Sequence, residues 1–258
     1  SGFTKDLNAR PKVGSPTATY KFGVVDLARD TLIYIAPDTL PGIFDIPENT
    51  SVSSKKNGKP QARAVRFAGP YWSDNGMHAF VVIESRDNKD RWLALLDVGS
   101  ATIRPFERQQ DDAWIGGPNI SGRFSAGSVG WLPDNQTIWF CSEQSGYSHL
   151  YTYNIGSHEK RALTQGEFEI YSPEISRDKK SWTFTANDVH PGERHFYRMP
   201  LAGGDWQRLT SLPGNNEAHL SPDGKMLVVR RSYFNEPWEL YTQKARPGSD
   251  VRKVTQST

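Results

Sequence analysis

Short apolar and aromatic runs alternate along the chain with clusters of Pro, Asp, Asn and Gly. In each cluster an Asp or Asn side chain can accept hydrogen bonds from backbone N–H groups two residues on, and Gly or Asn tolerates the positive φ that follows. The run after each cluster is rich in β-branched and aromatic residues, as strands are. The pattern predicts four tight turns, at Ser73–Gly76, Pro133–Gln136, Arg177–Lys180 and Pro222–Lys225. A strand is predicted after each turn, at 79–83, 137–141, 181–185 and 226–230.

A polar hairpin and a second aromatic strand follow each of these strands. The second strands are predicted at 91–95, 149–153, 195–199 and 238–241. A short outer strand then ends the unit, and three of these carry Leu or Val followed by Thr, at Leu163-Thr164, Leu209-Thr210 and Val254-Thr255. The recurrence of this ending indicates an internal repeat.

The repeat length favours a β-propeller. Asp74, Asp134, Asp178 and Asp223 follow one another at intervals of 60, 44 and 45 residues, and the last two intervals match a blade of four short strands. A β-sandwich would also alternate strands and turns, but it lacks a phrase of this length. No helical periodicity extends over ten residues. We therefore expect an all-β fold, a complete or partial propeller with four clear blades.

The repeat also predicts where each blade lies. The blades are expected over residues 65–258, at about 65–110, 126–166, 170–213 and 215–258, with an insertion at 109–127 that accounts for the long first interval. Residues 1–64 are expected to form an irregular N-terminal blade, with strands at 20–25 and 31–35. The polar stretch 47–62 is predicted to be a mobile loop.

Composition and charge exclude several classes of protein. The chain contains 8 Trp, 10 Tyr and 12 Phe, which is typical of a globular domain rather than a disordered one. The net charge is only +2 and no basic stripe is present, so we expect no nucleic-acid partner. No apolar run has the length of a membrane span. The single cysteine, Cys141, follows an apolar run and is expected to be a buried structural thiol.

The sequence carries no recognisable catalytic motif. A nucleophile elbow needs Gly-x-Ser-x-Gly, and the two nearest matches, Ser125 and Ser128, lack the preceding Gly. The six histidines form no metal-ligand motif, and the Gly-Lys pairs lack the spacing of a phosphate-binding loop. We therefore predict no catalytic residue, no metal and no cofactor in this chain.

The insertion holds the candidate binding residues. Loops that interrupt a repeat carry function more often than the strands do. The adjacent carboxylates Asp111 and Asp112 could hold a cationic group such as the free amine of a peptide, and Trp114 follows them directly. Arg123 is a candidate clamp for a carboxylate or a carbonyl. A solvated acidic loop is the alternative interpretation.

Several segments together resemble the propeller of dipeptidyl-peptidase-IV-like enzymes, which belong to the prolyl oligopeptidase family of serine peptidases. The resemblance covers roughly residues 65–258. It rests on the ordered succession of Arg108–Pro118, Ser142–Tyr151, Ala162–Glu169, Asn187–Tyr197 and Ser221–Gly224.

The resemblance implies a longer parent protein in which substrate binding and catalysis involve separate domains. The family places an N-terminal propeller over a C-terminal α/β-hydrolase domain that carries the Ser, Asp and His of the triad. It also implies a pair of propeller glutamates that hold the substrate's amino terminus. The present sequence has no Glu-Glu pair, and Asp111-Asp112 lies in a comparable type of insertion.

The first hypothesis is therefore a non-catalytic propeller that gates and orients peptide substrate for a hydrolase domain missing from this chain. Its partners would be the peptide and that hydrolase domain, and the isolated chain would be inactive. The resemblance implies a periplasmic or secreted location. An incomplete ring would leave sheet faces open, so a homodimer is also expected.

Two other classes of function remain open at this stage. A stand-alone propeller could be a protein-binding module, and the reading frame beyond Thr258 would discriminate it from the first hypothesis. A propeller glycosidase would need carboxylates that converge on the central channel about 5–10 Å apart. The acidic candidates here are few and lie in a loop.

Overall fold

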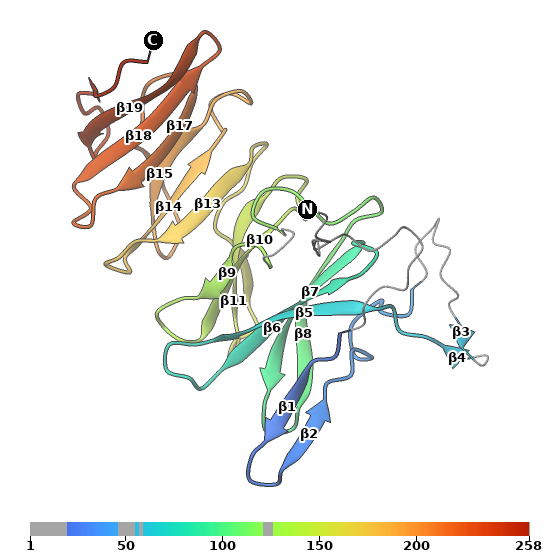
Figure 1. The fold of residues 1–258 in the computed structure, drawn as a ribbon. Helices are drawn as coiled ribbons and strands as arrows, with labels where there is room; N and C mark the ends of the chain where they lie inside the picture. Colours follow the sequence, from blue (N-terminus) through green and yellow to red (C-terminus); the bar gives the residue numbers. More distant parts are fainter. Residues whose placement is uncertain (1–19, 46–54, 57–58, 121–125, 258) are drawn as a thin grey trace, which may run out of the picture.

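The part of the chain that the structure describes folds entirely into strands. The structure is a computed structural model that describes residues 20–45, 55–56, 59–120 and 126–257, and these form twenty strands and no helix. Four sheets contain four antiparallel strands each, every one built from strands that are consecutive in sequence (Figure 1). Within these residues no helix could cross a membrane.

We name the four sheets blades 1 to 4 in chain order. Blade 1 contains β5 (Val65–Trp72), β6 (Ala79–Ser85), β7 (Asp90–Asp97) and β8 (Thr102–Gln110). Blade 2 contains β9 (Val129–Trp131), β10 (Thr137–Ser142), β11 (His149–Asn154) and β12 (Lys160–Ala162). Blade 3 contains β13 (Ile170–Ile175), β14 (Ser181–Ala186), β15 (His195–Pro200) and β16 (Gln207–Arg208). Blade 4 contains β17 (Asn215–Leu220), β18 (Met226–Tyr233), β19 (Glu236–Lys244) and β20 (Arg252–Lys253).

Consecutive four-stranded meanders of this kind are the blades of a β-propeller. The blades follow one another across the molecule from β5–β8 to β17–β20 (Figure 1). The prediction of an all-β propeller, complete or partial, with four clear blades is confirmed.

The N-terminal part is irregular, as expected. The strands β1 (Gly23–Asp26) and β2 (Thr31–Tyr34) form a two-stranded hairpin beside blade 1 (Figure 1). The predicted loop over 47–62 is interrupted by a second short hairpin of β3 (Lys55–Lys56) and β4 (Lys59–Pro60). Residues 47–54 and 57–58 of that loop lie outside the described residues.

Side chains hold the turn between the first two strands of each blade. In blades 3 and 4 the hydroxyls of Ser176 and Ser221 donate to the carboxylates of Asp178 and Asp223, both over 2.6 Å. In blade 2 the carboxylate of Asp134 accepts from the backbone N–H groups of Gln136 and Thr137 at 2.9 Å. In blades 2, 3 and 4 the recurring Asp is therefore a turn-forming residue, whereas in blade 1 Asn75 rather than Asp74 accepts from the hydroxyl of Ser73 and the N–H of Met77.

The hydrophobic core lies between the blades rather than within one sheet. Phe80 and Val82 of β6 pack against Ile138 and Phe140 of β10, between blades 1 and 2. Between blades 2 and 3, the rings of Trp139 and Trp182 meet edge to face with their centroids 5.2 Å apart. In blades 1 to 3 the central strand thus buries side chains on both faces.

Blade 4 departs from this rule, because its central strand β18 alternates between buried and exposed residues. Leu227 and Val229 are buried against blade 3. Their neighbour Val228 is 48% exposed, and Leu240 of β19 is 38% exposed. Among the described residues, nothing comparable to the next blade covers this outer face.

The Thr that ends three of the units clamps the outer strand to its neighbour. The hydroxyl oxygens of Thr164, Thr210 and Thr255 accept from the backbone N–H groups of Leu150, Phe196 and Leu240 at 3.0, 2.9 and 2.8 Å. In blades 2 and 3 the same hydroxyl also contacts the buried ring of His149 or His195. The repeated Leu/Val-Thr ending is therefore a structural signal.

Replacing one of these clamps should destabilise the fold. Thr210→Val removes the partner of the N–H of Phe196 and of the Nδ1 atom of His195 in a buried position, which costs about 1–3 kcal/mol of unfolding free energy. The measurement is urea unfolding, with Thr242→Val on the outer face of blade 4 as the matched control. Equal stabilities for the two variants would contradict the clamp.

Candidate functional site

The insertion between β8 and β9 is fixed at its start to blade 1. The N–H groups of Asp111 and Ile115 donate to the carbonyls of Lys89 and Asn88 at 3.0 and 2.6 Å. The ammonium of Lys89 donates to the carbonyl of Ala113 at 2.6 Å and also to that of Asp112. The insertion therefore begins as an ordered loop on the β6–β7 turn.

Further along, the insertion crosses to blades 2 and 3. The hydroxyl of Ser148 donates to the carbonyl of Pro118 at 2.6 Å. The side chain of Asn119 donates to the carbonyl of Ile170 and accepts from the N–H of Ser172, both at 2.8 Å. The insertion is thus tied to three blades at the end of the sheets where the β6–β7 and β10–β11 turns lie.

A buried arginine holds the segment where it re-enters blade 2. Arg91 is fully buried, and its guanidinium donates to Ala126 O at 2.6 Å and to Gln109 Oε1 at 2.8 Å. Burial lowers the pKa of Arg91 to about 10, so the guanidinium remains charged at neutral pH. Charged side chains therefore hold both ends of the insertion, Lys89 at its start and Arg91 at its end.

Three of the four predicted site residues, Asp111, Asp112 and Trp114, lie in one turn of the insertion. One carboxylate oxygen of Asp111 accepts from the N–H groups of Ala113 and Trp114 at 2.7 and 2.9 Å, which makes it the cap of a turn. Trp114 is 71% exposed and Asp112 is exposed next to it. Arg123 lies outside the described residues.

Two acidic residues that the sequence analysis did not select lie beside this loop. Glu143, in the β10–β11 turn, lies against Gly117, where an added Cβ would be 1.8 Å from its Oε1 atom. Glu169, before β13, accepts from the N–H of Ser148 at 2.5 Å. Burial raises the pKa of Glu143, and the charges of Glu169 and Asp111 raise it further.

These carboxylates come from three separate places in the sequence. Spacing alone could not connect Asp111, Glu143 and Glu169, because the blades bring them together. The available signal was the resemblance itself, since Glu143 and Glu169 lie within two of the segments that carry it.

The chemistry that this surface offers is binding rather than bond breaking. Three carboxylates and an exposed indole can hold a cationic group against an aromatic face. The described residues contain no group of three His, Cys, Asp or Glu placed to hold a metal ion. The thiol of Cys141 is buried, and burial raises its pKa to about 12, so it is not a nucleophile at neutral pH.

Comparison with known proteins gives one family and several relatives. The family model described as "Dipeptidyl peptidase IV (DPP IV) N-terminal region" matches residues 7–238. Dipeptidyl peptidase 4 of Trichophyton equinum is 25% identical over 250 residues, and that of Arthroderma otae is 28% identical over 251. Each alignment covers 94% of this chain but 29% of the relative, so the chain spans under a third of those proteins.

Among solved structures, the crystal structure of TolB from Acinetobacter baumannii matches with a TM-score of 0.45 and 19% identity. The match covers 77% of this chain and 45% of that one.

The raised pKa of Glu143 predicts a pH-dependent effect on stability. A carboxyl whose pKa is higher in the folded state destabilises the fold as pH rises through that pKa, and has no such effect below the unfolded value. Glu143→Gln should therefore raise the melting temperature at pH 7, with a gain that shrinks towards about pH 4, below the ordinary Glu pKa.

Differential scanning fluorimetry across this pH range measures the effect. Glu167→Gln, in the exposed loop before β13, is the matched control and should change little. A gain for Glu143→Gln that is constant with pH would contradict the electrostatic account.

Proposed function

This chain belongs to the family of dipeptidyl peptidase IV N-terminal regions, and from that premise we propose that it gates and orients peptide substrate for an α/β-hydrolase domain of a longer parent chain. The observation that carries the proposal is the family match over 7–238, combined with relatives of which the chain spans 29%. The parent would be a serine peptidase whose catalytic residues lie outside this chain.

The absence of a nucleophile motif supports this division. No serine in the sequence stands in Gly-x-Ser-x-Gly. The blades are rigid where their central strands are buried on both faces, which suits a scaffold that positions loops for another domain. Gating and orientation need only such loops.

We assign the binding role to the insertion surface of Asp111, Asp112, Trp114, Glu143 and Glu169. Its carboxylates would attract the amino terminus of a peptide, and the exposed indole of Trp114 would pack against the first side chain. Arg123, as predicted from the sequence, would bind a peptide carbonyl or carboxylate.

The same end of the blades also offers apolar side chains for the hydrolase domain to contact. Phe234, in the β18–β19 turn, is 84% exposed, and Val189, in the β14–β15 turn, is 49% exposed. Because every second turn of a meander lies at one end of the sheet, these turns share their end with the β10–β11 turn that holds Glu143. We propose that the hydrolase domain docks there.

The isolated chain should be catalytically inactive. Purified residues 1–258 should not hydrolyse chromogenic dipeptide substrates that end in proline, because the proposal places the nucleophile elsewhere. Hydrolysis by this chain that a serine-reactive inhibitor abolishes would contradict the proposal.

In the parent peptidase, neutralising the acidic loop should weaken substrate binding and leave the chemical step intact. Asp111→Asn keeps the turn-capping oxygen but, combined with Asp112→Asn, removes two negative charges. We expect KM to rise about tenfold, equivalent to ~1.4 kcal/mol, with kcat unchanged.

Steady-state kinetics with a free-amino peptide measures this change. Asp97→Asn, at the exposed end of β7 opposite the insertion, is the control and should leave KM unaltered. A fall in kcat at constant KM would contradict a role in holding the amino terminus.

A further inference from the structure

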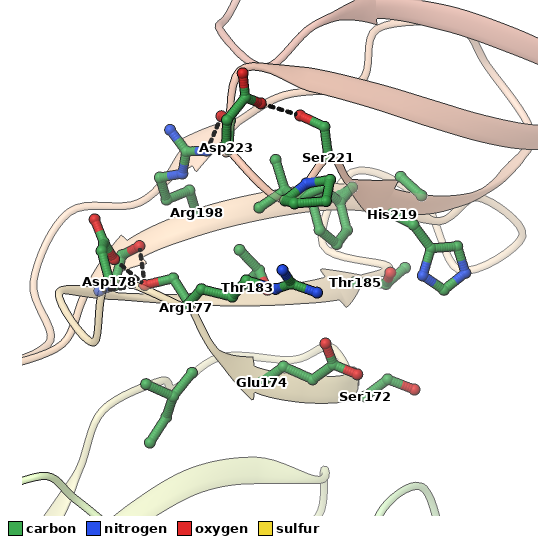
Figure 2. A pocket seen from close by; sticks show the side chains of 18 residues that line it. Ser172, Glu174, Arg177, Asp178, Thr183, Thr185, Arg198, His219, Ser221 and Asp223 are labelled. Carbon is green, nitrogen blue, oxygen red and sulfur yellow. Dashed lines mark hydrogen bonds between the residues drawn. The ribbon is translucent and has the colours of Figure 1, made fainter.

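A polar cavity lies between blades 3 and 4, where the other blades have apolar packing. Its volume is about 480 Å³, and its walls come from β13, β14 and β15 on one side and from β17 and the turn after it on the other (Figure 2). Cavities of this size fall within the range of small-molecule sites, about 300–1,000 Å³.

The cavity exists because blade 3 breaks the packing pattern of the repeat. On the second strand of each blade, alternate side chains face the previous and the next blade. Those facing the next blade are Phe80 and Val82 in blade 1 and Trp139 and Cys141 in blade 2. In blade 3 they are Thr183 and Thr185, which line the cavity.

Burying threonine at these positions costs free energy of folding unless its hydroxyl forms a hydrogen bond. Thr183 is 5% exposed, and Val would fill the same volume without burying a hydroxyl. Blade 4 presents Ala218 and Leu220 on the facing wall of the cavity, so an apolar partner would fit. The two threonines therefore indicate a site that is kept polar.

Charged side chains of both signs border the threonines. Glu174, Thr183 and Arg198 lie side by side on β13, β14 and β15. Figure 2 shows the side chain of Arg177 extending along the cavity towards Thr183 and Thr185, with the carboxylate of Glu174 on the adjoining wall.

Among the described residues, some charged side chains that line the cavity are already hydrogen-bonded within the protein, and others form no ion pair. The carboxylates of Asp178 and Asp223 are hydrogen-bonded within their own turns. Arg198 donates to the carbonyl of Gly224 at 3.3 Å through one nitrogen. Within the described residues, neither Glu174 nor Arg177 forms an ion pair.

We propose that this cavity binds a small zwitterion, an amino acid or a short peptide with both ends free. Its carboxylate would be held by Arg177 and Arg198, its ammonium by Glu174, and its polar groups by the hydroxyls of Thr183 and Thr185. A purely anionic ligand would face the uncompensated charge of Glu174, and a purely cationic one that of Arg177. This site is separate from the insertion surface, and the proposal does not depend on the proposed function.

Isothermal titration of the full chain with alanyl-alanine tests the charge assignment. The free dipeptide should bind at least tenfold more tightly than N-acetyl-alanyl-alanine or alanyl-alanine amide. Glu174→Gln should abolish the discrimination against the N-acetyl form only, and Arg177→Gln should reduce the discrimination against the amide only, because Arg198 still faces the ligand carboxylate. Glu167→Gln and Arg246→Gln, exposed and outside the cavity, are the matched controls and should keep both preferences.

A second variant separates binding from packing. Thr183→Val should raise the melting temperature, because it completes the apolar interface, and should weaken dipeptide binding at least tenfold. Absence of saturable binding by the wild-type chain, equal binding of the three peptides, or unchanged binding by Thr183→Val would overturn the proposal.

Discussion

The face-to-face packing of neighbouring blades is the interaction on which the rest of this structure depends. A four-stranded sheet with apolar side chains on both faces is stable only when both faces are covered. Trp182 shows this most clearly, since it is fully buried and packs against Trp139 of the preceding blade. The turn caps and threonine clamps keep each meander in the register that makes such contacts. The packed blades in turn fix the positions of the loops that join their strands.

Both candidate sites follow from this constraint in opposite ways. The insertion surface exists because three tightly packed blades bring Asp111, Glu143 and Glu169 to one end of the molecule, where Trp114 is exposed. The cavity between blades 3 and 4 exists because Thr183 and Thr185 stand where blades 1 and 2 have apolar side chains that pack against the next blade. Rigid interfaces place groups from distant parts of the chain together, whereas a relaxed interface leaves room for a ligand.

Much of the fold could be predicted from the sequence, because the second and third strands of each blade are apolar and follow recognisable turns. The first strands of blades 3 and 4 are harder to predict. β13 contains Pro173 and a register shift at Ser172, whose φ is 47°, and β17 is largely polar. Within the site, Asp111 and Trp114 could be selected because they are neighbours in sequence. Glu143 and Glu169 could not, because only the packing of blades brings them there.

The outer face of blade 4 is where the constraint remains unmet among the described residues. Val228 and Leu240 lie on that face, exposed, while their neighbours are buried against blade 3. We expect such a face to be covered, by another blade of the parent or by a second copy when the chain is alone. Light scattering of purified residues 1–258 over a range of concentrations tests this most directly. The account predicts self-association that the double variant Val228→Lys, Leu240→Lys abolishes, and a wild-type chain that stays monomeric at every concentration would contradict it.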